Sequence, residues 1–231
     1  MGERVCQRTA TELSSYPTEL EAHVTLTDQR RIRIRALHSR EERPIRVLHA
    51  RLSPRTRYLR FLSPIPTLPD ALVRRLACVD YRRRLAVVAE DEGGGRAGVV
   101  ALASFTAVDE TTAEVAVVVQ DDWQRQGVGT ALLSMLLDAA EQRGFDRFVA
   151  TIGADNSIIR RLLNRFGRVV ASHTSFGVSE LVFVRRHSWR NAVPRSGVGG
   201  DLPVAFASGS RDNGVNHECS FFDGYWREGT R

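Results

Sequence analysis

Apolar residues recur along the chain with two different periods, and the period changes several times between residues 22 and 186. Alternating or short continuous apolar runs predict strands, and apolar residues three or four apart predict helices. The expected strands lie within 22–37, on both sides of a Thr-Asp-Gln turn, and over 85–89, 97–105, 112–120, 146–152, 168–173 and 179–186. The expected helices lie over 39–52, 53–62, 68–78, 129–142 and 155–167. Only the later part alternates strand and helix, so we expect a mixed α+β sheet with helices on both sides.

Two of these helices begin with residues that often cap a helix. Ser39 precedes Glu42 by three residues, which is the spacing of a capping box. Ser53 is followed by Pro54, and proline is common at the first helical position because its missing N–H is not needed there. Gly144 is expected to end the helix over 129–142.

The chain divides by composition into three parts. Residues 1–21 are polar and irregular and predict a flexible arm, and residues 22–186 carry the periodic segments of one globular domain. Residues 187–231 are rich in Gly, Ser, Asn and Arg without a sustained period, which predicts a disordered tail. Four aromatic residues near its end are weak evidence for a docking segment: Phe221, Phe222, Tyr225 and Trp226.

Length and composition exclude several classes of protein. The 231 residues are 42% hydrophobic and 26% charged, enough for one domain with a proper core. No run of about 18 apolar residues predicts a membrane helix, and the N-terminus lacks the apolar region of a secretory signal. Three cysteines lie far apart, and the six histidines show no metal spacing. We therefore expect a cytoplasmic protein without a metal site or a membrane anchor.

The net charge of +6 raises nucleic acid as a partner. All 33 basic residues are arginines, however, and they are scattered along the chain instead of forming one basic block. The charge suits a small anionic ligand equally well. We expect no nucleic-acid partner.

A glycine-containing loop, Gln124-Arg125-Gln126-Gly127-Val128-Gly129, lies between a predicted strand and a predicted helix. The first N–H groups of a helix are unpaired and its dipole is positive there, so a phosphate is a natural ligand. Glycines would let the backbone approach it closely. A turn without a ligand is the alternative. A Rossmann fingerprint would need a third glycine, and a Walker A loop would need a lysine, which the chain does not contain.

The loop resembles the R/Q-x-x-G-x-G/A signature of the GNAT superfamily of N-acetyltransferases, and the order of elements over 22–186 is similar to that fold. Asn156, eleven residues before Gly167, agrees with a further marker of the family. The resemblance implies a mixed, mostly antiparallel sheet of six to seven strands flanked by helices, with acetyl-CoA as cosubstrate. The segments around 49–61, 113–133 and 154–167 resemble the bacterial Pat-type protein lysine acetyltransferases.

The resemblance also implies which residues bind acetyl-CoA. The loop would hold the pyrophosphate, and the backbone of the preceding strand would pair with the pantetheine arm and polarise the thioester carbonyl. The implied residues are Val117, Val118, Val119, Gln124, Arg125, Gln126, Gly127, Val128, Gly129, Thr130 and Asn156. The valines could equally be plain core, and Asn156 could be only a helix cap. Arg125 and Arg160 are further candidates for phosphate contacts.

Two positions depart from the family pattern. Leu163 stands seven residues after Asn156, where many small-molecule members carry a tyrosine that protonates the leaving thiolate. Arg168 stands where a phenylalanine usually follows the glycine at the end of the helix. No tyrosine acid can therefore be assigned, which favours the protein-acetylating group.

Glu114 is the candidate general base. It lies within Ala-Glu-Val-Ala-Val-Val-Val and shares a strand face with Ala116 and Val118 if side chains alternate. A carboxylate among apolar neighbours should have a raised pKa, which suits a base that deprotonates an amine near neutral pH. A strand-end glutamate that points to solvent is the alternative. Asp121 and Asp122 are weaker candidates and fit a turn before the helix.

The predicted function is transfer of an acetyl group from acetyl-CoA to an amine, with lysine side chains of proteins as acceptors. The resemblance implies metabolic enzymes such as acyl-CoA synthetases as those proteins. Two alternatives stay open: acetylation of a small amine or antibiotic, and a catalytically inactive CoA-binding regulatory domain. Four arginines near the junction of the first two expected helices fit either the acceptor side or a solvated helix face: Arg51, Arg55, Arg57 and Arg60. The oligomeric state is left open.

Overall fold

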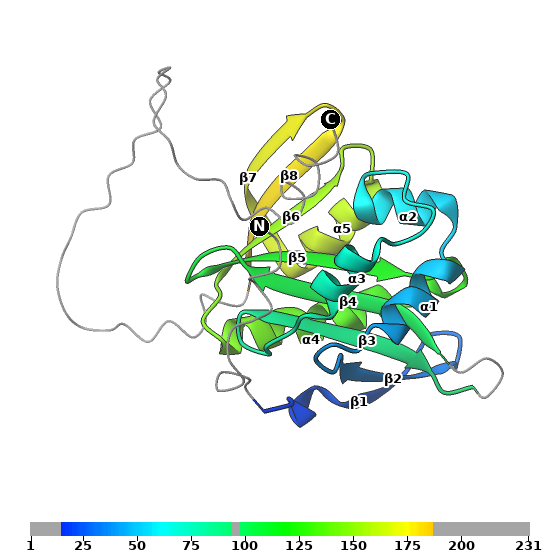
Figure 1. Ribbon diagram of the computed structural model, residues 1–231. Coiled ribbons are helices and arrows are strands. Elements are labelled where there is room, and N and C mark those ends of the chain that lie inside the picture. The colour runs from blue at the N-terminus through cyan, green and yellow to red at the C-terminus, as the bar shows by residue number, and fades with distance from the viewer. Residues whose placement is uncertain (1–14, 94–97, 187–231) are drawn as a thin grey trace, which may run out of the picture. The chain divides into compact units, whose positions relative to one another are not determined.

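A computed structural model describes residues 15–93 and 98–186, and its core is one sheet of eight strands (Figure 1). The strands are β1 (Ala22–Thr25), β2 (Arg31–Ala36), β3 (Arg84–Asp91), β4 (Val99–Ala107), β5 (Thr112–Val119), β6 (Arg147–Gly153), β7 (Gly167–Ser175) and β8 (Val178–Arg185). Their order in the sheet is β1-β2-β3-β4-β5-β6-β8-β7. Every pairing is antiparallel except that of β5 with β6.

The mixed, mostly antiparallel sheet is confirmed, but the expected count of six to seven strands is wrong. The four residues of β1 pair with β2, so the N-terminal hairpin extends the same sheet, and the hairpin of β7 and β8 extends its other end. The strands of both hairpins were predicted from the sequence, those of the first hairpin from alternation. Alternation alone, however, does not reveal that two separate hairpins join one sheet, because that depends on long-range pairing.

Five α-helices and two 3-10 turns are found in the described residues. They are η2 (Thr18–Leu20), α1 (Arg43–Arg51), α2 (Pro54–Phe61), α3 (Asp70–Ala77), η3 (Asp121–Trp123), α4 (Val128–Gln142) and α5 (Ser157–Phe166). Along β5, Val118 points toward α1 and α2, while the next side chain, Val119, points toward the start of α4. Since successive strand side chains point to opposite faces, α1 and α2 cover one face of the sheet and α4 covers the other (Figure 1).

The core fills the space between α4 and the sheet. The apolar face of α4 buries Leu132, Leu133, Leu136 and Leu137. On the strands, the phenylalanine rings of Phe148 and Phe183 pack with centroids 5.5 Å apart. No helix of the described residues is both long and apolar enough to cross a bilayer.

The predicted start of the first helix at Ser39 is wrong. The helix α1 begins at Arg43, and its N-cap residue, Glu42, makes no side-chain cap. The hydroxyl of Ser39 instead donates to the carbonyl of Val79 at 2.9 Å, and the Ser39 N–H donates to the Tyr81 hydroxyl at 3.0 Å. The Ser39 hydroxyl, which would have capped the helix, is therefore used in a tertiary hydrogen bond. At the next helix, the Ser53 cap is confirmed, because its hydroxyl oxygen accepts the Thr56 N–H at 3.2 Å.

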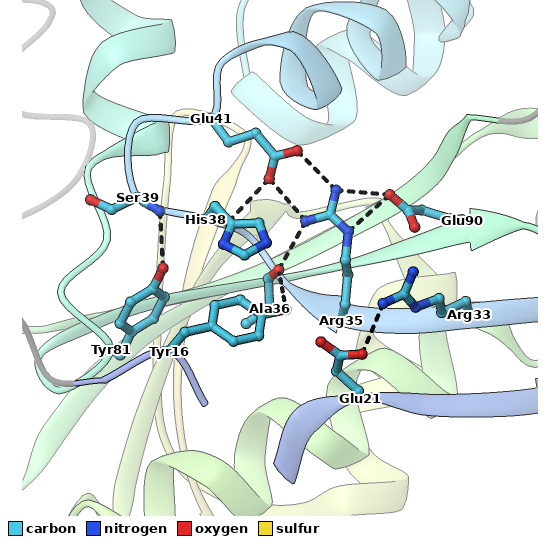
Figure 2. Close-up of polar contacts among 10 residues, drawn as sticks. All are labelled: Tyr16, Glu21, Arg33, Arg35, Ala36, His38, Ser39, Glu41, Tyr81 and Glu90. Atoms are coloured by element: carbon cyan, nitrogen blue, oxygen red, sulfur yellow. Dashed lines mark hydrogen bonds and ion pairs between the residues drawn. The ribbon is translucent and has the colours of Figure 1, made fainter. Parts of the chain in front are cut away.

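The buried side chain of Arg35 fixes the segment that leads from β2 into α1 (Figure 2). Its guanidinium donates to both carboxylate oxygens of Glu41 at 2.9 Å, to Glu90 on β3 at 2.9 Å and to the carbonyl of Ala36 at 3.0 Å. Burial lowers the pKa of Arg35, but the hydrogen bonds with Glu41 and Glu90 outweigh it and raise the pKa above its usual value. This network holds the start of α1 against the sheet.

Residues 15–21, the end of the segment assigned to an N-terminal arm, pack beside this network. The ring of Tyr16 stacks on His38 with centroids 4.3 Å apart, and its hydroxyl donates to the carbonyl of Ala36 at 3.3 Å (Figure 2). Leu20 is buried. The domain boundaries at 21/22 and 186/187 stay predictions, and residues 187–231 with their aromatic cluster lie outside the described residues.

Candidate active site

The strands β5 and β6 separate partway along their length. Their parallel pairing covers Thr112, Ala113 and Glu114 of β5, and stops there. Beyond Glu114, β5 continues to pair with β4 as far as Val119. The edge of β5 over 115–119 that faces β6 is therefore left without a paired strand in the described part of the chain. Such an edge offers backbone N–H and C=O groups to a ligand.

Glu114 stands at the point of separation. Its register partner on β6 is Val149, the last one of that pairing, and its side chain is half-buried. Arg60 of α2 interacts electrostatically with it. The neighbourhood of Glu114 is thus not only apolar, as the sequence suggested, because a cation lies beside it.

Arg60 itself is buried, with 8% of its surface exposed. Burial lowers the pKa of its guanidinium to about 10, and the charge of Glu114 partly opposes this. For Arg60 the solvated-face interpretation is therefore wrong. Arg51 and Arg55 are exposed, and Arg57 is half-buried, donating to the carbonyls of His49, Ala50 and Pro66.

The loop before α4 contains two glycines in different backbone conformations. Gly127 is the N-cap residue of α4 and has φ of +95°, a conformation that residues with a Cβ rarely adopt. Gly129 has an ordinary φ, and a Cβ there would lie 3.4 Å from Val119 of β5. The first N–H groups of α4 have no partner within the helix and point out of its N-terminus. The loop can therefore hold an anion through its backbone.

The glutamine side chains of this loop bind other parts of the protein. The amide of Gln124 donates to the carbonyl of Val119 at 3.0 Å and to the hydroxyl of Thr56 at 3.3 Å. The amide of Gln126 donates to the carbonyl of Asp122 at 3.1 Å. Their side chains shape the loop, and the backbone remains the group available to a phosphate.

Asp121 connects the loop to α2. Its carboxylate accepts hydrogen bonds from the Ser53 N–H at 2.9 Å, the Ser53 hydroxyl at 2.7 Å and the Thr56 hydroxyl at 2.7 Å. Partial burial raises its pKa, but these hydrogen bonds outweigh burial and leave the pKa below its usual value. The interpretation of residues 121 and 122 as a turn is confirmed by η3, and the turn also positions the helix that carries Arg60.

Sequence reasoning missed Arg30, which lies at the end of the turn between β1 and β2. Its guanidinium lies 3.8 Å from the centroid of the Trp123 ring and donates to the carbonyl of Asp122 at 3.1 Å and to the side-chain oxygen of Gln126. Asp28 accepts from its Nε at 2.6 Å. No local pattern could have indicated this contact, because Arg30 and Gln126 are 96 positions apart in the sequence.

The remaining candidates lie on or near α5. Asn156 is its N-cap, since the side-chain oxygen accepts the Ile159 N–H at 3.2 Å, so the capping role is confirmed. Arg160 donates to the Ser179 hydroxyl at 3.3 Å, while Arg125 is exposed. Leu163 is buried and belongs to the core. Among the residues that the structure describes, no cluster of His, Cys, Asp and Glu could hold a metal ion.

Comparison with known proteins identifies a family for this chain. Residues 53–167 match the Acetyltransferase (GNAT) family. The chain is 33% identical to Acetyltransferase PA5475 of Pseudomonas aeruginosa over 146 residues, which cover 63% of this chain and 78% of that protein. It is 35% identical to Acetyltransferase Pat of Mycolicibacterium smegmatis over 119 residues, 51% of this chain but only 35% of that longer protein.

A solved structure, the GNAT domain of S. lividans PAT, has the same fold. It aligns with a TM-score of 0.63 and 28% identity, and the match covers 73% of this chain and 99% of that domain. Together these findings define the class of protein: an acyl-CoA-dependent transferase with a GNAT fold. The chain belongs to the GNAT acetyltransferase family, and it transfers an acetyl group from acetyl-CoA to an amine acceptor.

Proposed function

We propose that this enzyme acetylates lysine side chains of proteins, with Glu114 as the general base. The observation that carries the proposal is the position of Glu114, half-buried where β5 and β6 separate and beside the open edge of β5. An amine approaching that edge would meet the carboxylate.

The base is needed because a lysine amine is mostly protonated at pH 7. Glu114 takes a proton from the acceptor nitrogen, so that the nitrogen lone pair can form the new C–N bond. Arg60 favours the ionised carboxylate, which is the form that can accept a proton.

Backbone groups would stabilise the charge that develops on the thioester oxygen. Val117 and Val119 would supply these N–H donors on the edge that β6 does not pair, whereas the N–H of Val118 faces β4. Acetyl-CoA supplies the acetyl group, and CoA leaves as a thiolate when the C–S bond breaks. Since thiols have a pKa of about 8.5, that thiolate is a good leaving group near neutral pH even without a tyrosine at position 163.

The donor's pyrophosphate fits the N-terminus of α4. Gly127, Val128, Gly129 and Thr130 would contact it through N–H groups, with Gln124 and Gln126 shaping the turn. Arg125, which is exposed, would add a positive charge beside them. The capping role of Asn156 leaves a contact with the donor as a further proposal.

Similarity to Pat-type proteins supports a protein acceptor, and an acyl-CoA synthetase is the proposed partner. The test is mass spectrometry of lysine acetylation in an extract of the native cell, with the parent protein or Glu114→Gln added together with acetyl-CoA. We expect new acetyl-lysines only with the parent protein. Acetylation of small amines alone would favour the small-molecule alternative, and acetyl-CoA binding without any transfer would favour the regulatory one.

We also propose that the protein is cytoplasmic and that it does not bind nucleic acid.

A further inference from the structure

A small pocket lies between α1, α2 and α3 and the sheet face that carries Glu114. Its volume is about 20 Å³, enough for one methyl-sized or hydroxyl-sized group. Leu102 of β4 and Val118 of β5, which are register partners, form the wall on the sheet side. Most of the other lining side chains are apolar, namely Ile45, Leu48, Leu52, Phe61, Leu68 and Leu76. His49 and Arg60 are its two polar residues.

His49 is the unusual member of this lining. It is 6% exposed, and its ring packs against Phe61 with centroids 5.8 Å apart. Within the described residues, its Nε2 is buried and has no hydrogen-bond partner. Burial and then the nearby charge of Arg57 lower the pKa of His49, while a backbone hydrogen bond with Ile65 opposes them. The ring is therefore neutral at pH 7.

A neutral imidazole has one N–H and one lone pair. The backbone of Ile65 interacts with one ring nitrogen, so the proton belongs there and Nε2 carries the lone pair. A buried acceptor without a donor destabilises the protein, and a ligand with an O–H group could supply the missing hydrogen bond. A water molecule would be held poorly, because it needs two to four polar partners and the pocket is mostly apolar.

We propose that this pocket is an acyl-chain subsite for short hydroxyacyl-CoA donors of three or four carbons, whose hydroxyl donates a hydrogen bond to Nε2 of His49. The proposal rests on the placement of the thioester at the 117–119 edge, given under Proposed function. Val118 belongs both to that edge and to the pocket wall, so a chain longer than acetyl would extend from the thioester over Val118. The pocket volume limits how far that chain can extend.

The subsite can be tested without knowing the acceptor, by calorimetric titration of the full chain with pairs of donors. One pair is propionyl-CoA and 3-hydroxypropionyl-CoA, the other is butyryl-CoA and 3-hydroxybutyryl-CoA, and acetyl-CoA is the reference. We expect at least one hydroxyacyl donor to bind about tenfold more tightly than its plain partner, the effect of one satisfied buried hydrogen bond.

His49→Leu should reduce that preference to less than about twofold, because leucine has no acceptor. His49→Gln should retain part of it, since the glutamine side chain carries an oxygen. The matched control is His23→Leu, because His23 lies on β1 and is largely exposed, and it should keep the full preference.

Equal affinity within both donor pairs for the parent protein would overturn the subsite, and so would an unchanged preference in His49→Leu. Even if the leucine variant does not fold, the parent protein and His49→Gln decide the question. Normal acetyl-CoA binding without a hydroxyl preference would refute only the subsite. No acetyl-CoA binding at all would refute the donor placement and the subsite together.

Discussion

The guanidinium of Arg30 lies 3.8 Å from the centroid of the Trp123 ring and bridges the turn between β1 and β2 to the loop that precedes α4. It also contacts Gln126 within that loop. A residue of the first hairpin thus supports the conformation of the proposed pyrophosphate site without belonging to the family signature.

Arg30→Ala should weaken the binding of acetyl-CoA about three- to tenfold, because the variant loses one cation–π contact and the hydrogen bonds to the loop. The effect should appear in KM more than in kcat. Acetyl-pantetheine, which has no pyrophosphate, should bind the variant and the parent protein equally. The neighbouring Arg31→Ala is the control, because Arg31 pairs with Glu92 and not with the loop. Equal losses for both donors would show that Arg30 has only a general structural role.

Gly127→Ala should lower acetyl-CoA affinity about tenfold, since alanine disfavours a φ of +95° and would displace the N–H groups of the loop. Gly177→Ala is a matched control, because Gly177 also has a positive φ, +77°, but lies in the turn between β7 and β8. Both variants should melt at a similarly lowered temperature in calorimetry. If the two variants bind acetyl-CoA with the same affinity, the pyrophosphate assignment is wrong.

Glu114→Gln should reduce turnover by about 10²- to 10⁴-fold while acetyl-CoA affinity stays near normal, because a base acts on the acceptor amine and not on the donor. The deficit should shrink as the pH rises, since the acceptor then loses its proton to solvent. Glu110→Gln is the control, because Glu110 is exposed and pairs with Arg83. A pH–rate profile of Glu114→Gln identical to that of the parent protein would exclude Glu114 as base.

Asp121→Asn should lower the melting temperature at neutral pH. The folded-state pKa of Asp121 lies below its usual value of 3.8, so its carboxylate contributes stability above that value. This contribution is lost as the pH falls through the folded-state pKa. The difference between variant and parent should therefore be full at pH 5–7 and shrink below about pH 4.

Thermal melts of Asp122→Asn provide the control, because the backbone of Asp122 and not its carboxylate makes the contacts with Arg30 and Gln126. A pH-independent difference for Asp121→Asn would mean that the charge of Asp121 does not act on stability.

Incubation of the purified protein with acetyl-CoA should leave all internal positions without a stable acetyl group, because the chain contains no lysine. Only the α-amino group of the N-terminus can form a stable amide, and a cysteine could carry a labile thioester that hydroxylamine removes. Intact-mass spectrometry checks this. A stable adduct of about 42 Da at an internal residue would contradict it.

The sequence by itself determined the elements and the class of protein. Local periodicity predicted the strands and helices, because it records which side of each segment is apolar. The glycines before α4 and the order of the elements were enough to indicate the GNAT fold. The Ser53 cap and the turn at residues 121 and 122 were also predictable, since each depends on neighbours within a few positions.

Only the tertiary structure decided which distant groups meet. The separation of β5 from β6 after Glu114, the buried Arg60 beside that carboxylate and the contact of Arg30 with Trp123 all join segments far apart in the chain. Ser39 shows the same limit. Its local sequence predicted a helix cap, but in the folded protein its hydroxyl donates to the carbonyl of Val79 instead. Periodicity reports the polarity of each face, but the partner of a side chain depends on strand register and helix packing, which no local pattern encodes.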